Sequence, residues 1–126
     1  MKDTKQNSPP NKQKPPIGTH FILDFWGARN LENAEILEQS LRQAAEVAGA
    51  TCLQVNLHHF GEGQGITGVA LLAESHISVH TWPELNYAAF DIFMCGVCQA
   101  ELSVELLKEV FAPEKYEIKK ILRGEF

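Results

Sequence analysis

Apolar residues recur along this chain in two patterns, one with the period of a helix and one with the period of a strand. Residues 37–48 place leucine and alanine at helical spacing, with glutamate and arginine on the other face. Asn30 or Asn33 can cap the start of this helix, and Gly49 can end it. The spacing of valine, leucine and phenylalanine predicts a second helix around residues 104–111.

Strands are predicted where aromatic and β-branched residues run together between turns that contain glycine, asparagine or proline. These strands cover residues 18–26, 51–60, 67–73, 77–82, 87–94 and 116–122. A glycine-rich segment, residues 61–65, separates the second strand from the third and predicts a flexible loop.

The predicted elements follow the order β-α-β-β-β-β-α-β, which looks like two similar halves joined between residues 73 and 77. Helices that interrupt an antiparallel meander cover one face of its sheet. The predicted fold class is therefore α+β, a two-layer sandwich of one antiparallel sheet with two helices on one face. The uncovered sheet face needs a partner, so we expect the sheets of two copies to pack together in a dimer.

The N-terminal segment differs in composition from the rest of the chain. Residues 1–16 hold four lysines against Asp3 alone, together with four of the six prolines. Such a segment cannot bury enough apolar surface to offset the entropy that ordering it would cost. The sequence predicts a disordered tail over residues 1–16 and one folded domain over residues 17–126.

Net charge and cysteine content narrow the classes of function. Sixteen acidic and 11 basic residues give a formal charge of −5, which suits neither nucleic acid nor an anionic membrane as a partner. No apolar run approaches the roughly 18 residues of a membrane span, and no secretory signal is apparent. Three cysteines cannot all pair within the chain, so a reducing, cytoplasmic location is expected.

Residues 72–84 concentrate side chains that can do chemistry: two histidines, two serines, two glutamates, a threonine and a tryptophan. Polar groups in strands that otherwise resemble core are costly unless paired, so their density indicates function. The alternative is a strand pair whose polar residues simply face solvent. A serine hydrolase fits poorly, because Ser75 lies between Glu74 and His76 and not in a Gly-x-Ser-x-Gly elbow.

A metal site is also a poor fit to this sequence. His76 and His80 are four residues apart, which on a strand separates the two rings by about 13 Å, too far to share one ion. Cys95 and Cys98 form a single CxxC pair, which without a second pair is weak evidence for zinc or for redox chemistry. We therefore predict no metal.

Three motifs at characteristic distances carry a family resemblance. They are Glu74-Ser75-His76, the run Val79-His80-Thr81-Trp82-Pro83-Glu84, and residues 89–96 with the sequence AFDIFMCG. Together they resemble the S-adenosylmethionine decarboxylase proenzymes of bacteria and archaea, from about Gly18 to Leu122. The resemblance implies an enzyme of spermidine biosynthesis that acts on S-adenosylmethionine as a small-molecule substrate.

The resemblance implies that the enzyme makes its own cofactor. Ser75 would attack the carbonyl of Glu74, and a base would then eliminate the resulting ester. The products would be residues 1–74 and a chain of residues 75–126 that begins with a pyruvoyl group derived from Ser75. His80 matches the family's processing histidine, since imidazole titrates near neutral pH. Ser75 and His80 are five positions apart, so the chain is expected to turn or bulge near Glu74–Ser75.

The resemblance also assigns the residues of turnover. The pyruvoyl ketone would condense with the substrate amine as a Schiff base and accept the electron pair released with carbon dioxide. Cys95 matches the family's proton donor, whereas Cys98 has no counterpart role.

Four further positions match residues that contact substrate in the family. Phe60 and Trp82 offer aromatic faces to a sulfonium and an adenine, and Glu84 offers a carboxylate to ribose hydroxyls. Thr67 replaces a serine that is common at this position in the family, and the loop before it is one residue longer than usual. In the family's dimer, the loop at Phe60 lies against the partner's cofactor.

Two alternatives follow from these departures and from the fold. The same cofactor could act on arginine or ornithine, or the chain could be a non-catalytic regulatory partner of such an enzyme. The joint presence of Ser75, His80 and Cys95 argues against a non-catalytic partner.

Overall fold

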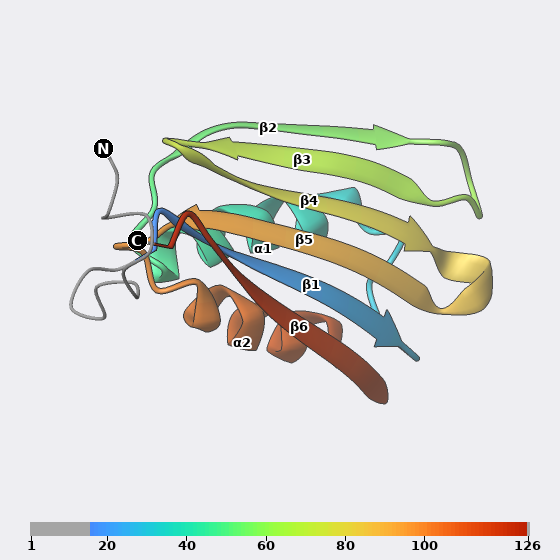
Figure 1. Cartoon of the computed structure of the whole chain (residues 1–126). Helices are drawn as coiled ribbons and strands as arrows, with labels where there is room; N and C mark the ends of the chain where they lie inside the picture. The colour runs from blue at the N-terminus through green and yellow to red at the C-terminus, as the bar shows by residue number, and fades with distance from the viewer. Residues whose placement is uncertain (1–15, 126) are drawn as a thin grey trace, which may run out of the picture.

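The computed structural model describes residues 16–125, which form one six-stranded antiparallel sheet with two helices on one side (Figure 1). The elements in chain order are β1 Gly18–Trp26, α1 Ala34–Val47, β2 Cys52–His59, β3 Ile66–Leu72, β4 Ser75–Trp82, the 3-10 helix η2 Pro83–Leu85, β5 Tyr87–Cys95, α2 Ala100–Phe111 and β6 Lys115–Arg123. The predicted tail lies outside the described residues, apart from Pro16.

The predicted fold class and element order are confirmed, and most predicted strand ends lie within one residue of the observed ones. The exception is β4, which begins at Ser75 and therefore includes two residues that the sequence had assigned to a connection. Leu72 pairs directly with Ser75, so only Ala73 and Glu74 remain between β3 and β4.

The strands lie in the order β2-β3-β4-β5-β1-β6. β1 pairs with β5 on one side and with β6 on the other, and both pairings are antiparallel. The first strand of the chain therefore lies between two strands of the second half. The two halves that the sequence indicates interlock within one sheet, with β2 and β6 at its edges (Figure 1).

The core lies between the sheet and the two helices. Asn33 caps α1 by accepting a hydrogen bond from the Ile36 amide at 3.0 Å, which selects one of the two predicted caps. Leu37 and Leu41 are fully buried on the sheet side of this helix. α2 packs beside α1, where the buried Ser103 hydroxyl donates a hydrogen bond to the Ala44 carbonyl.

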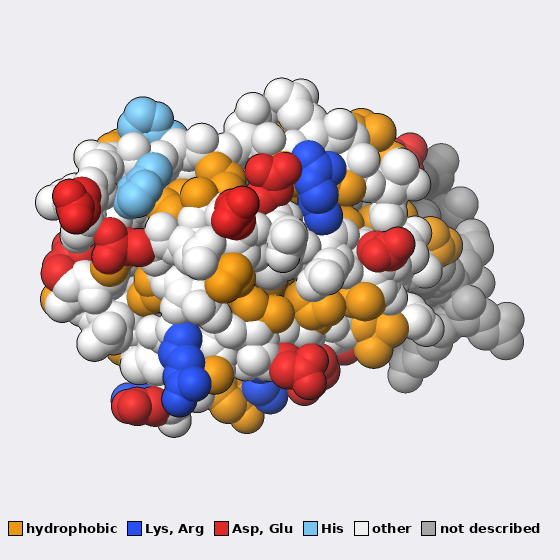
Figure 2. Space-filling view, turned by 180° about the vertical axis from the view of Figure 1, so that it is seen from behind, with side chains coloured by type: hydrophobic (Ala, Val, Ile, Leu, Met, Phe, Trp, Pro, Cys, Tyr) orange, Lys and Arg blue, Asp and Glu red, His pale blue; other side chains and the backbone are white. Residues whose placement is uncertain are grey.

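The other face of the sheet, here called the open face, is not covered by any described element (Figure 1). Leu71 and Trp82 alternate with buried residues on their strands, and Ile121 pairs with His20 of β1; the three are 43%, 39% and 42% exposed on this face. The helix-covered side, seen in Figure 2, instead carries acidic and basic side chains interspersed with apolar ones. The open face is thus the surface that the sequence analysis assigned to a partner.

Candidate active site

The β3–β4 hairpin presents the Glu74–Ser75 peptide bond at the end of the sheet. Its two-residue loop is exposed, and Glu74 has a φ of 62°, in the left-handed region that residues with a side chain seldom adopt. This conformation costs roughly 1–2 kcal/mol for a residue other than glycine. The predicted turn at Glu74–Ser75 is therefore present, and it is locally strained on the Glu74 side of the bond.

Antiparallel pairing of β4 with β5 brings Ser75 next to Cys95. The Ser75 hydroxyl accepts a hydrogen bond from the backbone amide of Cys95 at 3.1 Å. Both residues are half-buried, and they are 20 positions apart in the sequence. Two of the three predicted catalytic residues therefore meet where β4 begins and β5 ends.

Cys98 joins this pair, which sequence reasoning did not anticipate. Its sulfur lies 3.4 Å from the sulfur of Cys95. Burial, followed by the contact with Cys95, raises the pKa of the Cys98 thiol to about 11, so Cys98 is protonated at neutral pH. We call Ser75 and Cys95 the cleavage end of the sheet, and Cys98 lies beside it.

His80 lies near the other end of β4, beside Thr67. The two residues are direct partners in the β3–β4 register, and the Thr67 hydroxyl is 3.1 Å from Nδ1 of His80. This hydrogen bond holds the imidazole on the open face. Counting back through a two-residue loop from Ser75 to Leu72 gives the same pairing, so the sequence contained the signal for this contact.

The predicted substrate-binding residues gather around His80. A pocket of about 310 Å³ is lined by residues of the β2–β3 loop, β3, β4 and η2: Phe60, Gln64, Gly65, Thr67, His80, Thr81, Trp82 and Glu84. All four predicted binding residues are in this set, and Gln64 is an addition to it. We call this group the pocket end of the sheet.

Two contacts fix the shape of the pocket end. The buried Thr81 hydroxyl accepts from the Ile66 amide at 2.9 Å and donates to the Leu31 carbonyl at 2.8 Å, so it ties β3 to the loop before α1. A Cβ atom at Gly65 would lie 1.9 Å from the Thr81 carbonyl oxygen. Only glycine allows the loop to pass this close to β4.

Aromatic side chains extend from the pocket end across the open face. The rings of Trp82 and Tyr87 are 5.4 Å apart, and those of Tyr87 and Trp26 are 5.8 Å apart. The Tyr87 hydroxyl donates a hydrogen bond to Asp24, and burial together with this acceptor raises the pKa of Tyr87 to about 12. The tyrosine is therefore a neutral donor at any physiological pH.

Within one chain the cleavage end and the pocket end are far apart. β4 continues without a break from Ser75 to Trp82, so five residues at about 3.3 Å each separate Ser75 from His80 by about 16 Å. Alternation along the strand also assigns His80 to the open face and Ser75 to the opposite side. The turn at Glu74 therefore does not bring the serine and the histidine of one chain together.

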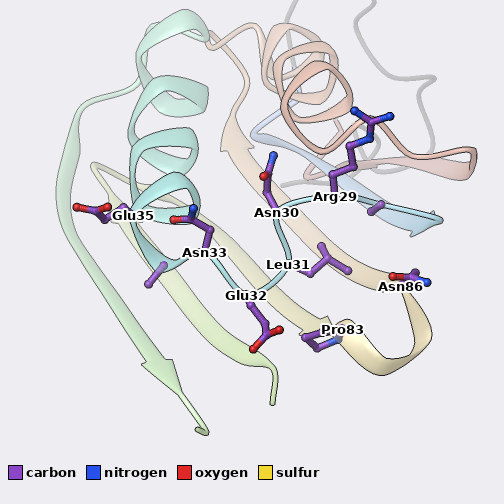
Figure 3. Close-up of a pocket in the computed structure, with 10 residues that line it drawn as sticks. Arg29, Asn30, Leu31, Glu32, Asn33, Glu35, Pro83 and Asn86 are labelled. Carbon is purple, nitrogen blue, oxygen red and sulfur yellow. The ribbon is translucent and has the colours of Figure 1, made fainter. Parts of the chain in front are cut away.

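A larger, open pocket of about 760 Å³ lies between the β1–α1 loop and the segment around η2 (Figure 3). Its lining includes Arg29, Glu32 and Asn86 but none of the predicted site residues. The Glu32 carboxylate also accepts a hydrogen bond from the Gly63 amide at 2.7 Å, which ties the glycine-rich loop to this region. The pocket thus borders the pocket end but holds none of the residues predicted to carry out catalysis.

Within residues 16–125, no cluster of three histidine, cysteine or acidic side chains has the geometry to hold a metal ion. No helix of that region is both long and apolar enough to cross a membrane. His76 stacks on Phe93 at a centroid distance of 5.9 Å and has no contact with His80.

Comparison with known proteins identifies the family. The sequence profile of S-adenosylmethionine decarboxylase matches residues 19–124. The chain belongs to the S-adenosylmethionine decarboxylase family. Proteins named S-adenosylmethionine decarboxylase proenzyme from Thermomicrobium roseum and Methanococcus maripaludis are 37% and 44% identical to it over 109 and 111 residues. These alignments cover 86% of this chain and 94% and 90% of the relatives.

A solved structure agrees with this assignment. The crystal structure of the adenosylmethionine decarboxylase from Aquifex aeolicus matches the fold with a TM-score of 0.79 and 29% sequence identity. The match covers 88% of this chain and 93% of the Aquifex chain. Membership of the S-adenosylmethionine decarboxylase family confirms the resemblance seen in the sequence motifs. It supports the predicted activity over the arginine, ornithine and regulatory alternatives.

Proposed function

We propose that the protein is a cytoplasmic, self-processing, pyruvoyl-dependent decarboxylase that converts S-adenosylmethionine to decarboxylated S-adenosylmethionine and carbon dioxide, for spermidine synthesis. The observation that carries the proposal is the cleavage end, where Ser75 follows a strained residue and contacts Cys95. Family membership gives this arrangement its chemical interpretation.

Ser75 carries out the cleavage of the chain. Its hydroxyl oxygen attacks the Glu74 carbonyl carbon, and the peptide C–N bond breaks as an ester forms. Removal of the Ser75 α-proton by a base then expels the Glu74 carboxylate, and hydrolysis of the remaining enamine releases ammonia. Backbone strain at Glu74 favours this reaction, because breaking the bond releases the left-handed conformation.

The residues at the cleavage end fit a pyruvoyl group at position 75. Serine has the hydroxyl that the acyl shift requires, and the Cys95 amide is a hydrogen-bond donor directed at the serine side chain. The group, once formed, supplies an electron sink for decarboxylation. The Cys95 thiol, on the open face beside it, is the acid that protonates the product carbon.

The pocket end recognises the substrate. Phe60 and Trp82 are 60% and 39% exposed, so their faces are free to stack on adenine and to attract a sulfonium cation. Glu84 is exposed beside them and accepts hydrogen bonds from ribose hydroxyls. Thr67 lies in the same pocket and orients His80.

A homodimer unites the two ends into complete sites. A two-fold axis that lies between two open faces and runs across the strands reverses the strand direction of one copy. The cleavage end of one sheet then lies over the pocket end of the other. His80 of one copy is the base that removes the α-proton of Ser75 of its partner, a proton on the backbone and not on the helix-facing side chain. This arrangement removes the separation of about 16 Å within one chain.

Cleavage of the purified protein tests the proposal first. Denaturing electrophoresis and mass measurement should find residues 1–74 and a blocked chain of residues 75–126. Ser75→Ala should remain intact because alanine has neither nucleophile nor leaving group, whereas Ser78→Ala, on the same strand, should cleave normally. The cleaved protein should release carbon dioxide from S-adenosylmethionine and not from arginine or ornithine. An intact chain that decarboxylates S-adenosylmethionine, or a preference for arginine, contradicts the proposal.

A further inference from the structure

The CxxC pair forms a tight turn at the end of β5. The Cys98 amide donates a hydrogen bond to the Cys95 carbonyl at 3.0 Å, so residues 95–98 are the four residues of a β-turn. The ends of a β-turn lie within about 7 Å of each other, and disulfides usually join Cα atoms about 4.4–6.8 Å apart. The two sulfurs already touch at 3.4 Å.

The turn is held from both sides and is open at its tip. The Gly96 amide donates to the Ile17 carbonyl, and the Gln99 amide donates to the Ala48 carbonyl, both at 2.9 Å. Val97, between them, is 83% exposed. The turn therefore keeps the two thiols together whether or not they are bonded, and small molecules can reach it.

The third cysteine is located differently. Cys52 lies at the start of β2, where its sulfur is 3.9 Å from a guanidinium nitrogen of Arg42. No thiol contacts it among the described residues, which include all three cysteines. An intrachain disulfide is thus accessible only to Cys95 and Cys98 in this conformation.

We propose that Cys95 and Cys98 are a reversible redox-modification site, and that their disulfide stops turnover of the cleaved enzyme. The effect on turnover rests on the proposed function, in which the Cys95 thiol supplies a proton. A sulfur in a disulfide carries no proton, so Cys95 cannot act as an acid while the bond exists. Formation of the bond itself depends only on the geometry of the turn.

Hydrogen peroxide is an oxidant of the required class, and the reaction balances with it. The Cys95 sulfur attacks the peroxide O–O bond, which gives a sulfenic acid and one water. The Cys98 sulfur then displaces the hydroxyl group from Cys95, and the proton lost from Cys98 leaves with it as a second water. The pKa of Cys98, raised to about 11, is consistent with a thiol that reacts second rather than first. A dithiol reductant reverses the bond.

The experiment treats the self-cleaved enzyme, which contains both of its chains, with hydrogen peroxide. The masses of the chains and the decarboxylation activity are followed on the same samples. The chain of residues 75–126 should lose about 2 Da and resist alkylation at both cysteines, while decarboxylation falls at least tenfold and returns with dithiothreitol. Cys98→Ser should be active when reduced, but its oxidation should proceed to a sulfinic acid that dithiothreitol does not reverse. Cys52→Ser should behave as wild type, which separates the intrachain bond from crosslinks between chains.

Two results overturn the redox site and one concerns the proposed function instead. Free alkylation of both cysteines after oxidation shows that the disulfide does not form. Equal loss and recovery of activity in wild type and Cys98→Ser shows that it does not control turnover. Reduced wild type that fails to decarboxylate S-adenosylmethionine contradicts the proposed function, whereas the mass and alkylation results still decide whether the bond forms.

Discussion

Ser75 and Cys95 interact through a backbone amide, which allows chain cleavage and turnover to be separated at the residue scale. Cys95→Ala retains that amide, so we expect it to cleave at Glu74–Ser75. It lacks the thiol proton, and loss of a general acid lowers a rate by about 100-fold or more. Cys98→Ala should match wild type in both reactions under reducing conditions. Electrophoresis and a carbon dioxide release assay on the same samples measure the two effects.

The opposite pattern would reverse the assignment of the donor. If Cys98→Ala loses decarboxylation while Cys95→Ala retains it, then Cys98 supplies the proton and Cys95 positions it. Failure of Cys95→Ala to cleave would instead assign a role in processing to its thiol.

The sequence analysis did not predict the side-chain contacts at the two ends of the sheet, and the reasons can be identified. Thr67 and His80 could be paired by counting through the hairpin, because an antiparallel register is fixed once its loop length is known. The contact between Cys98 and Cys95 was missed because the CxxC pair was weighed as a metal or redox motif, while its backbone conformation depends on Ile17 and Ala48. Distant hydrogen bonds of this kind leave no local signal.

The β3–β4 hairpin stores strain that can be measured at the scale of the element. Glycine at position 74 removes a cost of roughly 1–2 kcal/mol but adds chain entropy worth about 0.5–1 kcal/mol. In a Ser75→Ala background, which stays intact, Glu74→Gly should raise the free energy of unfolding by roughly 0.5–1 kcal/mol. Denaturant unfolding of the two intact proteins gives this difference.

The same substitution should slow cleavage when Ser75 is present. Part of the strain is released as the bond breaks, so its removal should lengthen the half-time of cleavage about two- to fivefold. Glu74→Gln keeps the left-handed backbone and the side-chain length, so it should alter neither quantity. Equal cleavage rates in wild type and Glu74→Gly would show that the strain at Glu74 does not assist the reaction.

Elements were predicted better than their junctions. The strands and helices follow from hydrophobic periodicity, which tertiary packing did not override. β4 was placed two residues late because Ser75 and His76 are polar, a composition typical of a connection. Their place in the sheet is set by pairing with Leu72 and Leu71, and pairing is not visible in a single segment of sequence.

At the scale of the whole molecule, one chain contains the parts of the proposed site but keeps them apart. The open face carries the pocket end, the aromatic rings that extend from it, and Cys95, yet no described element covers this face. Large apolar groups left exposed beside catalytic residues are typical of a surface that functions in contact with another. The order of the strands does not by itself separate the cleavage end from the pocket end. The separation depends on which ends of β4 and β5 carry the reactive side chains.

Complementation between two inactive variants tests the shared site. Cys95→Ala disables the cleavage end of a chain, and His80→Ala disables its pocket end. In a mixed dimer, one site combines an intact Ser75 and Cys95 from the His80→Ala copy with an intact His80 from the other copy. Random assembly makes half of the dimers mixed, each with one working site of two, so co-expression should restore about a quarter of wild-type activity. Each variant alone should be inactive.

Co-expression of Cys95→Ala with Ser75→Ala is the matched control, because both changes lie at the cleavage end and no mixed dimer contains a complete site. Absence of activity in the first pair, with mixed dimers shown to form by two affinity tags, would place the whole reaction within one chain.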